Sequence, residues 1–136
     1  MLRILIADDH AIVRRGLKDI LREAAEPAMV GEAGNGQEAL DKAQNETWDV
    51  VILDITMPDM SGLEVLKKLK QTRPQLPVLM LSMHSGEQYV HSSLKAGASG
   101  YLNKESAPEE LLMALHAIME GRRYLCQSLA AKIQID

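Results

Sequence analysis

This chain of 136 residues is poor in several residue types that mark particular protein classes. Its single cysteine, Cys126, excludes an internal disulfide and suits a reducing compartment. Phenylalanine is absent, and one tryptophan and three tyrosines are the only aromatic residues, so the core must be aliphatic. No apolar run approaches the roughly 18 residues of a membrane span, and no signal peptide pattern precedes the first predicted strand. We therefore expect a cytoplasmic protein without membrane contact.

Basic charge is also scarce, since the net charge is −4. A domain that binds nucleic acid by itself usually carries a basic excess, so direct DNA binding by these residues is not expected. No cluster of histidine and cysteine suggests a zinc site. Repeats and low-complexity linkers are also missing, and the length fits one domain.

Short apolar segments alternate with amphipathic ones along the chain. We predict strands over 3–7, 28–33, 49–54, 77–82 and 99–102, and helices over about 10–25, 37–45, 62–72, 86–96 and 108–121. Five strands alternating with five helices predict an α/β fold, in which a parallel sheet carries helices on both faces. Residues 122–136 have a weak helical pattern, and we expect them to be a tail or a linker.

The segment 49–54 is the most informative strand. Four apolar residues lead to Asp54, and a turn follows at Met57-Pro58-Asp59. An uninterrupted apolar run is typical of a parallel strand buried on both faces. Such a strand places its last residue at the carboxyl edge of the sheet, where open α/β folds bind ligands.

Polar groups follow three other predicted strands at the same edge. Asp8 and Asp9 follow the first strand, Ser82 ends the fourth, and Lys104 comes after the fifth. Each has an ordinary explanation as well: the acids could cap a helix, Ser82 could do the same, and a lone lysine is usually a surface residue. Their joint occurrence around Asp54 favours a functional site.

Three carboxylates in one pocket repel each other, so a compensating cation is expected. Lys104 supplies one positive charge, and a divalent ion such as Mg²⁺ or Mn²⁺ would supply more through carboxylate, carbonyl and water oxygens. A carboxylate nucleophile with a hard cation and an ammonium group can carry out phosphoryl transfer. The sequence thus indicates formation of an aspartyl phosphate.

The same residues resemble a known family. Asp8-Asp9, Asp54 with Met57-Pro58 and Gly62 behind it, Ser82, Ala96-Gly97-Ala98, Tyr101 and Lys104 together are similar to the receiver domain of two-component response regulators. The resemblance covers about residues 2–121, and we assign 1–121 to this domain. It implies a flavodoxin-like (CheY-like) doubly wound fold with five strands in the order 2-1-3-4-5.

The resemblance also implies roles for individual residues. Asp54 would be the phospho-acceptor. Asp9, Asp54 and the backbone carbonyl of Thr56 would bind Mg²⁺ directly, and Asp8 would bind it through a water. Lys104 would pair with Asp54 and then with the phosphoryl group.

Further residues would control and report the phosphorylated state. Ser82 would move toward the phosphoryl group and Tyr101 would turn inward, changing the surface of the fourth helix, fifth strand and fifth helix. Thr56 and His84 would set the lifetime of the acyl phosphate. Plain packing of Tyr101 on an edge strand and an ordinary exposed His84 are the alternatives.

Partners follow from the same resemblance. A sensor histidine kinase would phosphorylate the domain and would contact the first helix, where Arg14, Arg15 and Lys18 lie, although a row of basic residues is more often just a solvated face. Phosphorylation could also promote a homodimer through the fifth helix or the fourth and fifth helices.

Local sequences point to one branch of the family. Ala7-Asp8-Asp9-His10 and Gly97-Ala98-Ser99-Gly100-Tyr101-Leu102 resemble the NarL/FixJ branch, whose members usually carry a LuxR-type helix-turn-helix domain. We expect DNA binding and transcription regulation only through such a C-terminal domain, which these residues do not include, with 122–136 starting the linker.

Three other functions remain open at this level. A haloacid-dehalogenase-like phosphatase also uses an aspartyl nucleophile, but it would need a second aspartate where Thr56 stands. A nucleotide-binding module would need a glycine-rich loop after the first strand, where the sequence is acidic. A stand-alone receiver would act by binding a protein. We favour a switch that catalyses its own phosphotransfer from a phosphohistidine and its own slow dephosphorylation, rather than an enzyme acting on another substrate.

Overall fold

The structure is a computed structural model that describes residues 2–24, 28–83 and 87–130. Its strands are β1 (Leu2–Ala7), β2 (Ala28–Ala33), β3 (Val50–Asp54), β4 (Val78–Ser82), β5 (Gly100–Asn103) and β6 (Tyr124–Leu125). Its helices are α1 (Ala11–Arg22), α2 (Gly36–Asn45), α3 (Gly62–Thr72), α4 (Glu87–Lys95), α5 (Ala107–Met119) and α6 (Gln127–Ala130).

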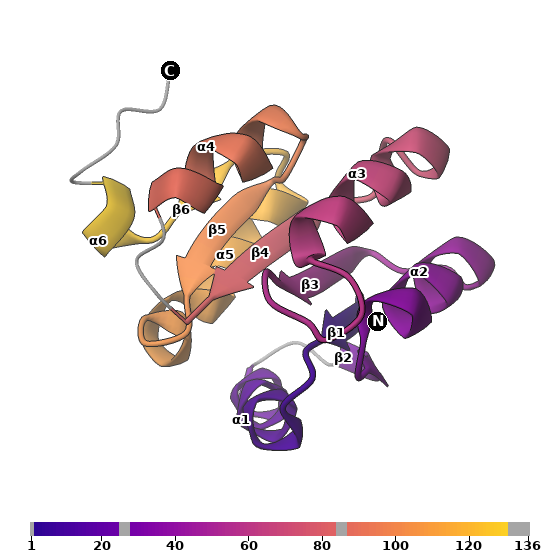
Figure 1. Cartoon of the computed structure of the whole chain (residues 1–136). Helices are drawn as coiled ribbons and strands as arrows, with labels where there is room; N and C mark the ends of the chain where they lie inside the picture. The colour runs from indigo at the N-terminus through magenta and orange to yellow at the C-terminus, as the bar shows by residue number, and fades with distance from the viewer. Residues whose placement is uncertain (1, 25–27, 84–86, 131–136) are drawn as a thin grey trace.

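All strand pairs are parallel, and the sheet order is β2-β1-β3-β4-β5-β6. The sheet is the middle layer of the fold, with α1 and α5 packed together on one face and α2, α3 and α4 on the other (Figure 1). This is the predicted doubly wound arrangement, and the predicted order 2-1-3-4-5 is confirmed for the first five strands. Because the strands are parallel, all of their carboxyl ends lie at one edge of the sheet.

The burial of β3, β4 and β5 explains why these strands could be predicted from apolar segments of the sequence. Every residue of β3, β4 and β5 is buried. A parallel strand covered by helices on both faces has no solvent side, so its sequence is continuously apolar rather than alternating. The burial of Asp54 and Ser82 at the ends of β3 and β4 follows directly from this geometry.

Two helices begin at side-chain caps that lie close to the carboxyl edge. The Asn35 side chain accepts a hydrogen bond from Glu38 N at the start of α2, and Ser61 does the same for Glu64 N at the start of α3. These caps satisfy backbone donors that a helix leaves unpaired. Within the described residues, none of the helices has the length and apolar character needed to cross a lipid bilayer.

The prediction of five strands and five helices is wrong at the C-terminal end. β6 pairs with β5 through Gly100↔Tyr124 and Tyr101↔Leu125, and α6 follows it directly. We call residues 124–130 the C-terminal segment. Periodicity could not detect it, because a two-residue strand has no period and its partner is supplied by the sheet. Residues 131–136 lie outside the described residues.

Gly62 at the start of α3 provides a test of how the loop after β3 is built. A Cβ atom at this position would lie 2.0 Å from the carbonyl oxygen of Asp54, whereas Gly16 in α1 has nothing within 4 Å. We expect Gly62→Ala to lower the free energy of unfolding by about 1–3 kcal/mol, because the loop backbone must move. Gly16→Ala is the control and should raise it by about 0.5–1 kcal/mol. Urea unfolding of both variants measures this, and equal stability of Gly62→Ala and the parent would contradict it.

Candidate functional site

The predicted site residues are held at the carboxyl edge by backbone hydrogen bonds that extend the sheet beyond its strands. Asp8 N donates to Ala33 O (3.0 Å), and Ile55 N, just after Asp54, donates to Leu81 O (2.9 Å). Lys104 N donates to Ser82 O at 2.8 Å. Each of these side chains therefore leaves the sheet from a fixed backbone position.

Lys104 joins the two buried carboxylates of the site. Its Nζ lies 2.8 Å from Asp8 Oδ2 and 3.3 Å from Asp54 Oδ2, and its side chain is only 10% exposed. Asp8 and Asp54 are 0% and 2% exposed. A lysine in this position is no ordinary surface residue, and Asp8 is not a solvated helix cap, whereas the Asp9 side chain is 29% exposed. The sequence-based grouping of Asp8, Asp54 and Lys104 is thus confirmed as geometry.

The charges in the site are not balanced. Burial, with repulsion from Asp8 as the second cause, raises the pKa of Asp54 from 3.8 to about 6, and Lys104 and the Thr56 backbone N–H only partly oppose this. The two carboxylates conversely raise the pKa of Lys104 and outweigh its burial, so the ammonium form is retained. One lysine does not compensate both acids, and a further cation would stabilise the site.

Two residues that contact this site, His10 and Arg14, were not recognised from the sequence. His10 Nδ1 lies 3.2 Å from both Asp8 Oδ1 and Asp9 Oδ1, and its backbone N–H donates to Asp8 Oδ1 at 2.8 Å. Arg14 donates to the backbone carbonyl of Asp8 at 2.5 Å. His10 directly follows the acidic pair in the sequence, and this was the available signal. Arg14 comes one helical turn later, which gave none.

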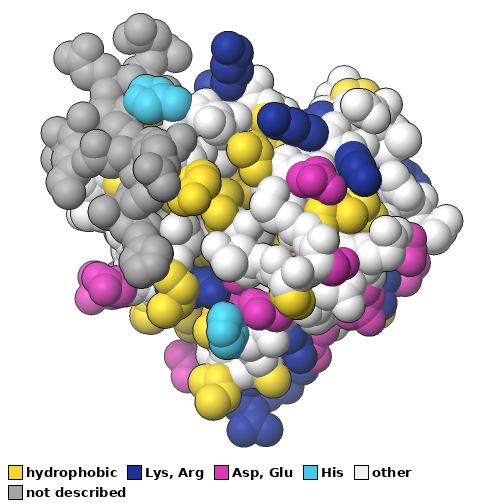
Figure 2. Space-filling view, viewed as in Figure 1, with side chains coloured by type: hydrophobic (Ala, Val, Ile, Leu, Met, Phe, Trp, Pro, Cys, Tyr) yellow, Lys and Arg dark blue, Asp and Glu magenta, His cyan; other side chains and the backbone are white. Residues whose placement is uncertain are grey.

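The acidic group has the donor atoms that a hard cation needs. Ligand atoms of Asp8, Asp9, His10 and Asp54 all lie within 4.8 Å of one another. The charge imbalance at Asp54 and the oxygen-rich donor set fit a divalent ion of the Mg²⁺ type. Asp9 and His10 are the members of the group that reach solvent, with side chains 29% and 59% exposed, whereas Asp8 and Asp54 are buried. Figure 2 shows acidic, histidine and basic side chains close together in the lower middle of this face.

Ser82 and Tyr101 are buried, as Asp8 and Asp54 are. Ser82 is 5% exposed and Tyr101 is 0% exposed. Burial raises the pKa of the Tyr101 hydroxyl, while the hydroxyl of Ser82 opposes the shift, so the two groups are neighbours. Tyr101 is thus in an inward position. Its strand is not an edge strand, because β6 covers it, so the alternative of edge-strand packing loses its premise.

Thr56 and His84 are the two residues expected to set the lifetime of the acyl phosphate. Thr56 is exposed, and its backbone N–H donates to Asp54 Oδ1 at 3.3 Å. It therefore stands at the mouth of the site, directly beside the acceptor carboxylate. His84 lies outside the described residues.

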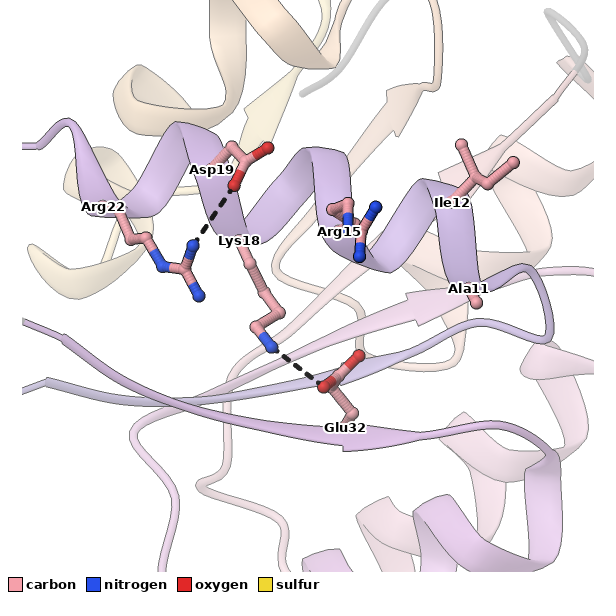
Figure 3. A pocket seen from close by; sticks show the side chains of 7 residues that line it. All are labelled: Ala11, Ile12, Arg15, Lys18, Asp19, Arg22 and Glu32. Atoms are coloured by element: carbon pink, nitrogen blue, oxygen red, sulfur yellow. Dashed lines mark hydrogen bonds and ion pairs between the residues drawn. The ribbon is translucent and has the colours of Figure 1, made fainter.

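Three basic residues of α1, Arg15, Lys18 and Arg22, line a groove beside β2, shown in Figure 3. Lys18 Nζ lies 3.1 Å from Glu32 Oε2, and Arg14 Nε lies 3.0 Å from Glu32 Oε1. Arg15 is exposed. Two of the three expected kinase contacts thus also hold α1 against β2. Their contact with a kinase stays a prediction.

Comparison with known proteins decides the family. The model of the response regulator receiver domain matches residues 4–116. The chain belongs to the response regulator receiver domain family. Its relatives include the transcriptional activator protein ExaE of Pseudomonas putida, 42% identical over 96% of this chain and 61% of that protein. The nitrate/nitrite response regulator protein NarL of Escherichia coli is 39% identical over 93% of this chain and 58% of its own length.

These relatives confirm the predicted LuxR/NarL-type branch. This receiver domain spans about three fifths of the length of the curated relatives that it matches. The predicted extent of the domain, 1–121, stays a prediction.

Solved structures agree with the fold. A LuxR-family two-component response regulator from Aurantimonas sp. SI85-9A1 matches with a TM-score of 0.90 and 36% identity over 96% of this chain and 94% of that one. The isolated REC domain of RcsB from Salmonella enterica serovar Typhimurium, in the presence of phosphomimetic BeF3-, gives a TM-score of 0.89 with 26% identity, covering 98% and 99% of the two chains. Its apo form gives 0.85 with 27% identity, covering 99% and 100%.

The raised pKa of Asp54 predicts how the stability of this receiver domain depends on pH. The folded carboxyl holds its proton up to about pH 6, whereas the unfolded one loses it near 3.8. Between these values the folded state binds more protons, so the free energy of unfolding falls as pH rises through this window. In EDTA, the contribution of Asp54 should decrease by at most about 3 kcal/mol between pH 4 and pH 7.

The variant Asp54→Asn, which keeps the shape but not the charge, should lose this dependence and be more stable than the parent at pH 7. Urea unfolding at several pH values measures the difference. Asp41→Asn, at an exposed acid of α2, is the matched control and should follow the parent. A constant difference between parent and Asp54→Asn from pH 4 to 7 would contradict the prediction.

Proposed function

We propose that this receiver domain is a phosphorylation-activated switch that accepts a phosphoryl group on Asp54 from a sensor histidine kinase. The observation that carries the proposal is the pairing of a buried Asp54 with Lys104 and Asp8 at the carboxyl edge of the sheet. Membership of the response regulator receiver family supports it. A switch fed by such a kinase would act in the cytoplasm.

The proposed step is an exchange of one phosphorus bond for another. A carboxylate oxygen of Asp54 attacks the phosphorus of a phosphohistidine, the new P–O bond forms, and the P–N bond breaks with its electron pair leaving on the imidazole. Asp54 must be ionised for this attack, so its pKa of about 6 leaves the nucleophile available at neutral pH. The domain contributes its own nucleophile and undergoes the change itself, and we do not regard it as an enzyme acting on a separate substrate.

The other residues hold charge where the reaction needs it. Asp9, Asp54 and the Thr56 carbonyl would hold Mg²⁺ or Mn²⁺, with Asp8 acting through a water, and the ion would supply charge stabilisation for the transferring group. Lys104 Nζ is already 3.3 Å from Asp54 Oδ2, so it would need little movement to bind a phosphoryl oxygen on Asp54. Arg14 and His10 orient the loop that carries Asp8 and Asp9.

The proposed readout begins at Ser82 and Tyr101. The Ser82 hydroxyl would donate to a phosphoryl oxygen, and Tyr101 would be held inward in the space beside it. The inward Tyr101 supports this arrangement, as does the slightly higher similarity to the BeF3- form of the RcsB domain than to its apo form. The surface of α4, β5 and α5 would then differ between the two states.

In the full-length protein, the switch would regulate transcription through a LuxR-type DNA-binding domain, as the names of relatives such as ExaE suggest. Residues after 121 would lead toward that domain. Homodimer formation on phosphorylation, through α5 or the α4–α5 face, would be one route from switch to DNA. Arg14, Arg15 and Lys18 on α1 would meet the kinase.

The central test uses acetyl phosphate as the phosphoryl donor. With Mg²⁺, we expect mass spectrometry to find a single phosphoryl adduct, labile to hydroxylamine and located on Asp54. EDTA should abolish it, because the carboxylate cluster then lacks a compensating cation. Asp54→Asn should take up no phosphoryl group, and Asp41→Asn, changing an exposed acid, should behave like the parent. No adduct, or an adduct on another residue, would overturn the proposal.

The lifetime of the adduct tests the role of Thr56. Asparagine at this position offers an amide that can orient a water toward the acyl phosphate. The acyl phosphate on Asp54 should therefore be hydrolysed several-fold faster in Thr56→Asn than in the parent. Removing the hydroxyl alone, in Thr56→Val, is the matched control for a change of side-chain shape. The decay of the phosphorylated species after removal of acetyl phosphate gives both rates. Equal rates for Thr56→Asn and the parent would remove Thr56 from the mechanism, and His84→Ala tests the second expected residue in the same way.

A further inference from the structure

The C-terminal segment is packed into the receiver domain by buried side chains and backbone hydrogen bonds, which a flexible linker would not have. Leu125 is 8% exposed, and Cys126 and Leu129 are fully buried. Backbone hydrogen bonds run from Tyr124 N to Ser99 O and from Cys126 N to Tyr101 O, each 3.0 Å long. The segment thus completes the sheet at the edge of β5 and closes part of the core, as Figure 1 shows for β6 and α6 beside β5.

A buried acid of α5 anchors the same segment. Glu110 is 8% exposed, and its Oε1 accepts the Tyr124 hydroxyl at 2.6 Å and the Gln127 N–H at 3.1 Å. These two bonds satisfy a carboxylate that would otherwise be costly to bury. If the segment left β5, Glu110 would lose both partners. The docked position is therefore specific, and it is held by polar as well as apolar contacts.

Asn103 connects the segment to the phosphorylation site. It pairs with Ser82 in the β4–β5 ladder and directly precedes Lys104. Its Nδ2 donates to Ser128 Oγ at 3.1 Å, and its Oδ1 accepts from Ser106 N at 2.8 Å, at the start of α5. One side chain between Ser82 and Lys104 thus touches both α5 and the C-terminal segment.

Tyr101 gives the second connection. Its backbone carbonyl accepts a hydrogen bond from Cys126 N at 3.0 Å, and both residues are fully buried. β4 flanks β5 on one side and β6 on the other, so the segment helps to fix the backbone of the strand that carries Tyr101. A docked segment consequently favours the inward position of Tyr101.

We propose that residues Tyr124–Ala130 are an output element of the switch, whose docking on β5 is strengthened by phosphorylation of Asp54 and in turn strengthens phosphorylation. The inference rests on the proposed function, in which the phosphorylated state holds Tyr101 inward. Thermodynamic coupling is reciprocal, so the factor by which phosphorylation strengthens docking of the segment is also the factor by which docking strengthens phosphorylation. Phosphorylation of Asp54 would thus affect a chain that follows the segment, although that chain makes no contact with Asp54.

Hydrogen exchange of the unmodified chain tests the first half. Amide exchange of Cys126 and Leu129 is compared with and without Mg²⁺ and beryllofluoride, a phosphoryl mimic. We expect exchange of both amides to slow by at least about fivefold when the mimic is bound. Unchanged or faster exchange, while beryllofluoride binding is seen by calorimetry, would overturn the inference and leave the proposed function intact. Absence of beryllofluoride binding would overturn both.

Undocking the segment tests the second half. Leu129→Ala removes its most buried side chain from α6, whereas Gln127→Ala changes an exposed side chain of the same helix and keeps the Gln127 N–H. Leu129→Ala should bind beryllofluoride at least about fivefold more weakly than the parent, and Gln127→Ala should bind it equally well. Unchanged protection of β1 and β3 amides in Leu129→Ala separates this effect from global unfolding. Equal binding by Leu129→Ala and the parent would overturn the coupling.

Discussion

The ion pairs of Lys104 with Asp8 and Asp54 are the interaction on which the site depends. Burying two carboxylates in a protein core is unfavourable unless they are paired and hydrogen-bonded. Here the backbone of the sheet fixes Asp8, Asp54 and Lys104 at its carboxyl edge, which keeps the three charged groups paired. One ammonium between two acids leaves a net negative charge, seen in the raised pKa of Asp54. The same imbalance that weakens the fold would be relieved by a cation bound at this place, and the proposed phosphoryl transfer depends on such a cation.

The sequence predicted the parts of the fold that repeat a simple physical pattern. Strands buried on both faces must be continuously apolar, so β3 and β4 were visible as runs ending in Asp54 and Ser82. The parallel arrangement then brought Asp8, Asp54 and Lys104 together without any knowledge of distances. What could be predicted was the set of residues at one sheet edge, because topology alone determines it.

Side-chain direction and long-range pairing could not be predicted in the same way. His10 was overlooked, although it contacts two predicted metal-site acids, because its ring could equally have pointed to solvent. β6 was overlooked because its two residues gain their structure from β5 and from Glu110, 14 residues before Tyr124. Short elements of this kind depend on tertiary contacts rather than on local propensity, so no periodicity precedes them.

The covered edge of β5 would constrain the proposed switch. If β5 were an edge strand, Tyr101 could move between an exposed and a buried position against solvent alone. Here the backbone of Tyr101 is bonded to Cys126, and Asn103 is bonded to Ser128, so movement in β5 must either carry the C-terminal segment along or break these bonds. Both Asn103 and Tyr101 lie within three residues of Lys104, which contacts the acceptor carboxylate. Under the proposed coupling, Asn103 and Tyr101 would connect a change at Asp54 to the last described part of the chain, in addition to the surface of α4, β5 and α5.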